Sequence, residues 1–280
     1  MTNNYPKITV VTPSYNQGQY LEKTIRSVIN QNYPNLEYIV MDGGSTDQSV
    51  EIIQKYSKYI TYWESQPDKG QADAIKRGFD KGTGEIYSWI NSDDLLCKNS
   101  LFHVAKAYQE NKNAGLFYGD SFLINQKDEL IRAFLCQQVN YEQLIHGSVS
   151  IFQGSTFYVS KAYHEVGGLN DSLHYAMEYE ILYKIAKLYP TQYINNFLGC
   201  FRNQPLAKSS TPKWIEIGRR EKQKIILDID NTDNQQNFYK IKSLFYSYKR
   251  RLIQIMKGRL YAQNKQNYHK CFDLDISHII

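Results

Sequence analysis

The sequence is poor in cysteine and has no long uncharged apolar run. Its four cysteines, Cys97, Cys136, Cys200 and Cys271, form no CxxC pair and no Cys/His set with zinc-site spacing. Such scattering favours reduced thiols in a cytosol over disulfides or zinc. No apolar run approaches the ~20 residues of a membrane-spanning helix, and the first ~30 residues lack a signal-peptide pattern. These absences predict a soluble, cytoplasmic protein.

Two nucleotide-binding motifs are also missing, since the sequence has neither a P-loop nor a GxGxxG segment. Their absence argues against a nucleotidyltransferase. At 280 residues the chain can bury a full core, as one large domain or as one domain with an appendage.

The formal charge of +5 is unevenly distributed along the chain. Residues 212–280 hold 14 Lys+Arg against 7 Asp+Glu, whereas the preceding residues hold 19 against 21. Such asymmetry indicates an extension that faces phosphate, although a solvated helix surface explains it equally well. No zinc or RRM-type signature accompanies the basic segment, so nucleic acid is not an expected partner.

Strand-like apolar runs alternate with helical periodicity up to residue 90. Strands are expected at residues 8–12, 36–41, 60–63 and 86–90. Ser45, with Gln48 three residues later, is the expected N-cap of the second helix. A third helix is expected to bury Ala74, Ile75, Gly78 and Phe79 on one face. This βαβαβ order predicts an α/β fold with a Rossmann-like, mostly parallel central sheet flanked by helices.

Beyond Ala114 the apolar runs become shorter. Strands at 116–118, 122–125 and 130–134 are expected to form a small antiparallel sheet, with a further strand at 155–159. Helices are expected over 176–188 and 214–227, followed by a polar linker and a long helix from about residue 238. The expected division is a domain at 1–211 and a basic helical C-terminal extension at 212–280.

Four polar segments follow the four expected parallel strands, at residues 12–14, 42–44, 68–70 and 91–94. Ligands of such sheets bind outside the carboxyl ends of the strands, so these segments are expected to converge on one site. Asp42 can accept a hydrogen bond from a nucleobase or ribose hydroxyl, but a turn with Ser45 explains it as well. Lys69 would bring a cation near phosphate, unless its segment is an ordinary surface turn.

The segment GEIYSWINSDD, residues 84–94, runs from an apolar strand into two adjacent acids. Hard divalent cations prefer oxygen ligands, and a carboxylate at a strand end can hold Mg²⁺ or Mn²⁺ against a diphosphate. Acidic loops are common, so Asp93 and Asp94 predict such a site only together with the convergent segments upstream.

The helix expected over 176–188 carries two glutamates in its first turn. Glu178 shares a face with the apolar residues Ile181, Leu182 and Ile185. Glu180 lies on the polar face, where an ion pair with Lys184 is a sufficient explanation. A carboxylate directed at a packed interface has a raised pKa or a function, so Glu178 is the candidate general base. The alternative is a carboxylate stabilised by the helix dipole.

Four segments, taken together, resemble the family 2 glycosyltransferases, which have the GT-A fold. They are ITVVTPSYNQGQYLEKTIRSVINQNYPNLEYIVMDGGSTDQSVEII, SQPDKGQADAIKRGF, GEIYSWINSDD and HYAMEYEI. They occur in the expected order, and the resemblance covers roughly residues 5–210.

The resemblance implies that Thr12, Pro13 and Asp42 hold the nucleoside of a sugar nucleotide, most often UDP. Asp68 would lie beside the base and ribose, and Asp93 would be the main ligand of Mn²⁺ or Mg²⁺. The other residues expected at the nucleotide sugar are Tyr15, Gly44, Lys69, Gly70, Asp73 and Ser92. Gln153, Gly154, Asp94 and His174 are expected on the donor-sugar or acceptor side, with loop polarity and a capped helix start as alternative explanations.

Three positions depart from the family pattern. Asn91 stands at the first Asp of the DxD motif, so it would bind metal through a neutral oxygen or not at all. Ile75 replaces a phosphate-contacting Arg, for which Lys76 or Arg77 is the nearest substitute. Gln204 stands where relatives often supply a metal-binding His. These departures leave a non-catalytic sugar-nucleotide-binding module as the alternative to an enzyme.

The expected reaction is inverting transfer of a sugar to a hydroxyl of a glycan or lipid-linked acceptor, in surface polysaccharide biosynthesis. Metal on Asp93 would act as a Lewis acid toward the departing diphosphate. Glu178 would deprotonate the acceptor hydroxyl as it attacks the anomeric carbon from the opposite side.

The last expected helix has a narrow apolar seam among many lysines and arginines. The seam consists of Phe238, Ile241, Phe245, Tyr248, Leu252 and Ile255. We expect it to dock on the catalytic domain or on a second subunit in a homodimer. The alternative is peripheral contact with anionic lipid at the inner face of the cytoplasmic membrane.

Overall fold

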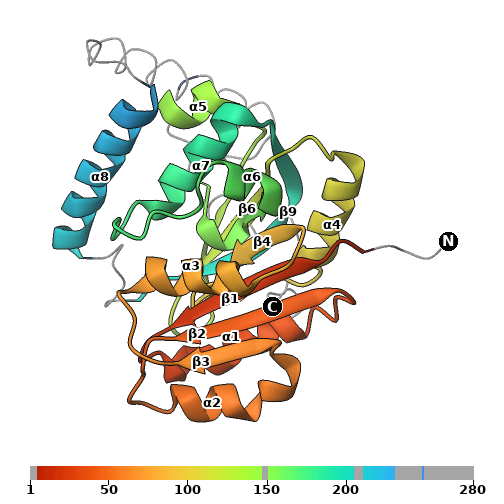
Figure 1. Cartoon of the computed structure of the whole chain (residues 1–280), viewed down its shortest axis with the longest axis vertical. Helices are drawn as coiled ribbons and strands as arrows, with labels where there is room; N and C mark the ends of the chain where they lie inside the picture. The colour runs from red at the N-terminus through yellow and green to blue at the C-terminus, as the bar shows by residue number, and fades with distance from the viewer. Residues whose placement is uncertain (1–4, 147–150, 205–210, 231–247, 249–280) are drawn as a thin grey trace.

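The computed structural model describes residues 5–146, 151–204, 211–230 and 248. One mixed β-sheet runs through the molecule, with helices packed on both faces (Figure 1). Most of the predicted seam from Phe238 to Ile255 lies outside the described residues; within it, Tyr248 is exposed.

The first half of the sheet is parallel, as predicted. Its strands lie in the order β3 (Tyr62–Ser65), β2 (Leu36–Asp42), β1 (Ile8–Ser14) and β4 (Ile86–Trp89). The connecting helices are α1 (Gly18–Ile29), α2 (Ser49–Lys55), the short η1 (Ser57–Tyr59) and α3 (Gln71–Lys81). The predicted βαβαβ alternation is confirmed.

The second half of the sheet continues beyond β4 without a break. The further strands are β8 (Thr156–Val159), β6 (Leu116–Ile124), β9 (Thr191–Arg202) and β5 (Leu95–Leu96), with β7 (Leu130–Phe134) paired to β6. The antiparallel strands therefore extend the central sheet, and the two strands expected at 116–118 and 122–125 are one strand, β6. Strand β9, which pairs in parallel with β6, was not among the predicted strands.

Alternate side chains of β1 face opposite layers of helices. Val10 joins the apolar cluster of α1 and α4 (Ser100–Glu110). Val11 joins the cluster of α3 and α7 (Met177–Leu188). Burial on both faces explains why the parallel strands are nearly continuous apolar runs.

The remaining helices are short, except for the last. They are α5 (Tyr141–His146), η2 (Gln153–Ser155), α6 (Ser160–Glu165) and α8 (Pro212–Asp230). Within the described ranges, no helix combines the length and apolarity needed to cross a bilayer.

Helix α2 begins three residues later than predicted, because Ser45 is not its N-cap. The Ser45 hydroxyl donates to the Asp42 carboxylate at 2.6 Å, and α2 starts at Ser49. The Asp47 carboxylate accepts the Ser49 N–H at 2.9 Å instead. Serine side chains bond to whichever nearby polar group the backbone offers, and here a buried carboxylate is closer than a free helix N–H.

Helix α3 packs unusually close to the sheet at Gly78, which the predicted apolar face includes. A Cβ at this position would lie 2.5 Å from a Val11 methyl carbon and 3.2 Å from Met41 Cγ. Glycine therefore sets the distance between α3 and strands β1 and β2.

Replacing Gly78 with valine should destabilise the fold by about 1–3 kcal/mol through overpacking. Equilibrium urea unfolding measures this loss. Asp80→Ala, at an exposed position of the same helix, is the control and should change stability by less than ~0.5 kcal/mol. Equal stability of the valine variant and the wild type would contradict the close packing.

Candidate functional site

The polar segments after the parallel strands meet at one edge of the sheet, as predicted. Ser14 at the end of β1 pairs with Asp42 of β2, and Asp42 pairs with Ser65 of β3. The Ile90 N–H donates to the Val11 carbonyl, which places the segment after β4 beside the end of β1. The carboxyl edge of the parallel strands is therefore lined by four turns.

The Asp42 carboxylate organises the turn that follows β2. It is 2% exposed and accepts the Gly44 and Ser45 N–H groups at 3.2 and 2.9 Å. The Ser45 and Ser65 hydroxyls donate to it at 2.6 and 2.7 Å. These bonds match the turn interpretation of Asp42, and its contact with a nucleotide stays a prediction.

Asp68 lies directly against this turn. A Cβ built on Gly43 would be 2.7 Å from Asp68 Oδ2, so the Asp68 carboxylate lies close against the backbone of Gly43. Asp68 Oδ1 accepts the Gly70 N–H at 2.7 Å, and Gly70 has φ +116°, in the region that favours glycine. Asp42 and Asp68, 26 positions apart, are thus brought to opposite sides of Gly43.

The other residues predicted at the nucleotide differ in exposure. Thr12 is buried, with its hydroxyl 3.0 Å from the Tyr38 hydroxyl, and Pro13 is buried beside it. Tyr15 is 62% exposed and Lys69 is exposed. Asp73 accepts the Lys69 N–H at 3.2 Å. Tyr15 and Lys69 therefore expose side chains at this edge, whereas Thr12 has no exposed surface.

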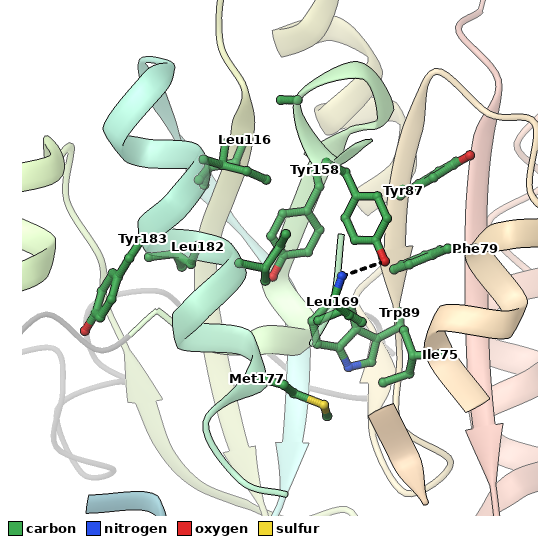
Figure 2. Packing of buried hydrophobic residues seen from close by; sticks show 14 of the residues in the cluster. Ile75, Phe79, Tyr87, Trp89, Leu116, Tyr158, Leu169, Met177, Leu182 and Tyr183 are labelled. Carbon is green, nitrogen blue, oxygen red and sulfur yellow. Dashed lines mark hydrogen bonds between the residues drawn. The ribbon is translucent and has the colours of Figure 1, made fainter. Parts of the chain in front are cut away.

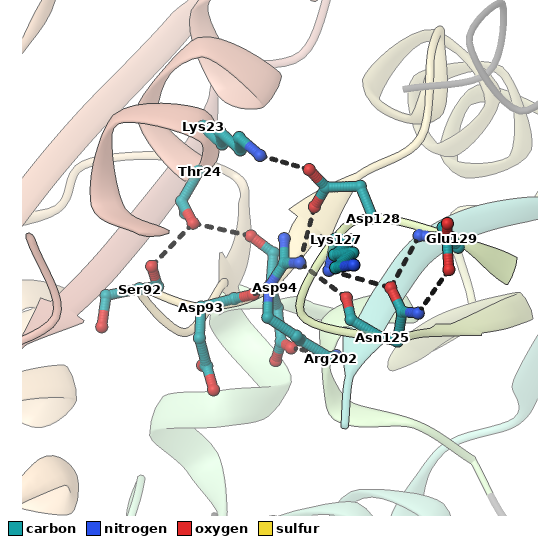
Figure 3. Close-up of polar contacts among 10 residues, drawn as sticks. All are labelled: Lys23, Thr24, Ser92, Asp93, Asp94, Asn125, Lys127, Asp128, Glu129 and Arg202. Carbon is teal, nitrogen blue, oxygen red and sulfur yellow. Dashed lines mark hydrogen bonds and ion pairs between the residues drawn. The ribbon is translucent and has the colours of Figure 1, made fainter. Parts of the chain in front are cut away.

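The turn after β4 is held by hydrogen bonds from two other segments, α1 and β9 (Figure 3). The Thr24 hydroxyl, from α1, faces the Ser92 and Asp94 carbonyl oxygens at 2.9 and 2.8 Å. The Arg202 N–H, from β9, donates to Asp94 Oδ1 at 2.9 Å. Asp94 Oδ2 accepts from the Asn91 amide at 3.1 Å. Asp94, predicted on the sugar side, is 2% exposed, and both of these bonds to its carboxylate hold the turn.

Asp93 points away from this network and meets the residue that follows β9. Its Oδ2 accepts a hydrogen bond from the Gln204 side-chain amide, and its carbonyl accepts from Arg202 Nε at 2.7 Å. Asn91 Oδ1, the neutral oxygen proposed as a metal ligand, accepts from Gln71 at 2.7 Å. The structure thus brings Asp93 together with Asn91 and Gln204, which are two of the three residues that depart from the family pattern.

Burial raises the pKa of the Asp93 carboxyl, with the Gln204 hydrogen bond acting in the opposite direction. Burial raises the pKa of Asp94 well above its usual range, and the neighbouring charge of Asp93 adds to it. Two carboxylates this close and this buried disfavour ionisation of both.

A divalent cation at Asp93 would relieve that cost, and its carboxylate is a suitable hard ligand. Among the described residues no three His, Cys, Asp or Glu side chains gather to hold a metal. The residues present therefore fit a cation that takes one carboxylate from the protein and its remaining ligands from a bound phosphate and water.

Glu178 lies in the first turn of α7, on its inward side. The apolar residues of its predicted face, Ile181, Leu182 and Ile185, are buried. Glu180 pairs with Lys184 at 2.9 Å, as predicted. The charge of Glu178 contributes to raised pKa values of Tyr158, Tyr175, Tyr179 and Tyr183, after burial, which is the larger cause in each case. Glu178 therefore acts electrostatically on four tyrosines of its neighbourhood.

A stacked aromatic pair, Trp89 and Tyr158, lies in the apolar cluster on the neighbouring strands β4 and β8 (Figure 2). The rings of Trp89 and Tyr158 lie 5.6 Å apart and nearly parallel. Trp89 is two residues before Asn91, and the Tyr158 phenol is influenced by Glu178. The stack thus joins the strand that leads into Asn91 to a phenol that feels the charge of Glu178.

Three residues predicted on the sugar side occupy supporting positions. The Gln153 amide donates to the Trp89 carbonyl. A Cβ on Gly199 would lie 2.3 Å from the Gly154 carbonyl oxygen, so η2 packs tightly on β9. The His174 N–H donates to Glu221 at 2.9 Å.

Sequence reasoning missed Gln71, Arg202, Tyr158 and Glu221 as parts of this region. Arg202 gave one signal, because a single arginine ends the apolar run LGCFR in the sequence. The other three have no local signal, since their partners are 20 or more positions away along the chain.

Comparison with known proteins gives the same family on independent grounds. The family model described as glycosyl transferase family 2 matches residues 9–167. The Bacillus subtilis putative teichuronic acid biosynthesis glycosyltransferase TuaG is 34% identical over 128 residues, 44% of this chain and 50% of that protein. The chain spans 33%, 33% and 61% of the first curated relatives, rickettsial proteins described as uncharacterized glycosyltransferases.

Two solved proteins share the fold. TarS 1–349 of S. aureus, in complex with UDP, has a TM-score of 0.62 at 16% identity, with 97% of this chain and 73% of that chain covered. TarS was also solved with UDP-GlcNAc, with a TM-score of 0.60. Mannosyltransferase PcManGT from Pyrobaculum calidifontis, in complex with GDP-Man and Mn²⁺, has a TM-score of 0.58 at 15% identity, with 96% and 84% covered. The predicted GT-A fold is confirmed, and the chain belongs to glycosyltransferase family 2.

Proposed function

We propose that this protein transfers a sugar from a UDP-sugar to a hydroxyl acceptor with inversion, in surface polysaccharide biosynthesis. One observation carries the proposal: the turns after the four parallel strands converge at one carboxyl edge of the sheet, and the last of these turns carries Asp93. TuaG by its name, and TarS by its complexes with UDP and UDP-GlcNAc, support the substrate class.

The nucleoside would lie over the turns after β1, β2 and β3. Tyr15 is exposed there and offers a ring face to the base. The backbone around Gly43 and Gly44 permits close approach, and Gly44 has φ +82°. Lys69 would contribute positive charge near the diphosphate.

The diphosphate would face the turn after β4, where Asp93 would hold a divalent metal. The metal, when bound, neutralises charge that develops on the departing diphosphate. Arg202 fixes the backbone of Asp93, and Thr24 fixes the carbonyls on either side of it. These residues orient the carboxylate before the donor arrives.

Glu178 would accept the proton of the acceptor hydroxyl from the face opposite the diphosphate. Such general-base assistance is worth roughly 10²–10⁴-fold in rate.

A non-catalytic sugar-nucleotide-binding module is the second candidate. The contact between Gln204 and Asp93 favours it, because an amide donor occupies a carboxylate oxygen that a metal would use. Both candidate functions predict that the protein binds the sugar nucleotide, but only the enzyme turns it over.

A thermal-shift screen of sugar nucleotides, followed by UDP release with and without Mn²⁺, tests the proposed function. A ligand that binds only the native state raises the melting temperature, so the screen selects the donor. We expect one UDP-sugar to stabilise the protein and to be turned over in Mn²⁺. Stabilisation without turnover on a panel of oligosaccharide and lipid-linked acceptors would favour the binding module.

Glu178→Gln should leave less than about a tenth of wild-type turnover, because it removes the proton acceptor and keeps the side-chain volume. Donor affinity should stay within about twofold. Glu180→Gln is the matched control in the same helical turn, paired with Lys184 outside the site. If Glu178→Gln were as active as Glu180→Gln, Glu178 would not be the base.

Gln204→His should raise Mn²⁺ affinity about tenfold, because an imidazole ligand replaces an amide that donates to Asp93. Calorimetric titration of Mn²⁺ in the presence of UDP measures the change. Asn203→His, at the exposed neighbouring position, is the control. An unchanged dissociation constant would place the metal away from Asp93.

We also propose peripheral membrane contact by residues 231–280, which hold nine Lys+Arg against three Asp+Glu. Truncation after residue 230 should abolish co-sedimentation with anionic liposomes at ~0.1 M salt and leave folding intact, because α8 is retained. Equal sedimentation of both proteins would reject the contact. A homodimer remains a prediction that light scattering of the same two proteins checks.

A further inference from the structure

Helix α8 lies beyond the domain boundary expected at residue 211, and its inward face packs against α7. Ile225 is buried in the apolar cluster that contains Ile181, Tyr183 and Ile185. A Cβ on Gly218 would lie 2.2 Å from the Tyr175 ring, so the two segments are in close contact. The division at residue 211 stays a prediction, but α8 shares a core with the rest of the chain (Figure 1).

One carboxylate of α8 is bound to the backbone immediately before α7. Glu221 Oε1 accepts the His174 N–H at 2.9 Å. Its Oε2 accepts the Tyr175 and Ala176 N–H groups at 2.9 and 2.8 Å. Ala176 is the N-cap of α7 and has no side chain that can accept a hydrogen bond. Glu221 therefore anchors the backbone that enters α7, and its negative charge near the start of the helix complements the helix dipole.

Lys222, the next residue of α8, contacts the first turn of α7 itself. The Lys222 ammonium lies 4.0 Å from the centroid of the Tyr179 ring. Burial lowers the pKa of Lys222, and the charge of Glu178 acts in the opposite direction, which places the two charges near each other. Consecutive residues of α8 thus hold the backbone at 174–176 and the ring at 179, on either side of Glu178.

We propose that Glu221 is a positioning residue that fixes the first turn of α7, and thereby Glu178, in the geometry for reaction. The inference rests on the proposed role of Glu178 as the base. Helix α8 is then part of the catalytic unit, although the family match at residues 9–167 ends before it.

Rate depends steeply on such placement, since misplacing a reacting group by ~1 Å can cost about 10²-fold. Without the carboxylate, three N–H groups before α7 lose their acceptor and the first turn is free to shift. Donor binding, at the carboxyl edge of β1–β4, does not involve these groups. Loss of Glu221 should therefore lower turnover and leave donor affinity unchanged.

The test compares Glu221→Ala, Glu221→Gln and Glu216→Ala in the full chain, using the UDP-sugar that the thermal-shift screen selects. Glu216 lies on the same helix and pairs with Arg219 and Arg220 at the surface. We expect Glu221→Ala to lower kcat for UDP release 10- to 100-fold with the donor Kd within about twofold. Glu216→Ala should match the wild type.

Glu221→Gln keeps the side-chain volume but presents one oxygen to three N–H groups, so an intermediate loss of about tenfold is expected. This variant decides the question if Glu221→Ala fails to fold. A folded Glu221→Gln with wild-type kcat would overturn the proposal.

The double variant Glu178→Gln/Glu221→Gln distinguishes positioning from a general loss of stability. If Glu221 acts through Glu178, the double variant should be no slower than Glu178→Gln alone. Multiplied losses would show that Glu221 acts elsewhere and would refute the positioning role. If Glu178→Gln alone retains full turnover, the proposed base is wrong, whatever the Glu221 variants do.

Discussion

The site depends on one buried cation. Arg202 has no exposed surface, and an unpaired guanidinium there would cost on the order of several kcal/mol. It donates to the carbonyls of Asp93 and Asn125, pairs with Asp128 and lies over the Tyr20 ring. These partners come from the end of β4, the turn between β6 and β7, and α1. One side chain therefore fixes three segments that are distant in sequence, and among them is the backbone of the proposed metal ligand.

The central sheet also fixes where Asp93, the proposed metal ligand, lies relative to Glu178, the proposed base. β4 leads into Asp93, and its neighbour β8 carries Tyr158, which stacks on Trp89 and lies within the field of Glu178. Adjacent strands are held ~4.8 Å apart by regular hydrogen bonding. Of the two acids that the proposed reaction requires, Glu178 is thus placed by a helix, and Asp93 by a turn that directly follows a central strand.

The parallel half and the face of Glu178 could be predicted from the sequence because both depend on local periodicity. The strand pattern up to residue 90 and the pair Glu180–Lys184 involve neighbours within a few positions. β9 pairs with β6 about 75 positions away, and Gln204 meets Asp93 across 111 positions, so no local pattern reports them. For Ser45 the sequence offered both a helix cap and a turn with Asp42, and the folded turn selects the bond to Asp42.

Gln204 does not by itself decide between an enzyme and a binding module. A single carboxylate with two amides binds a divalent cation weakly in the absence of other ligands. A diphosphate brings further oxygens, and Mg²⁺ or Mn²⁺ sites on nucleotides commonly use one or two protein carboxylates with substrate phosphates. A glutamine side chain can also present its oxygen in place of its amide nitrogen by rotation about its last torsion. Metal and donor would then bind cooperatively at Asp93, because the diphosphate supplies further oxygen ligands and the metal neutralises its charge. A metal site that is weak without donor is therefore compatible with metal-dependent transfer.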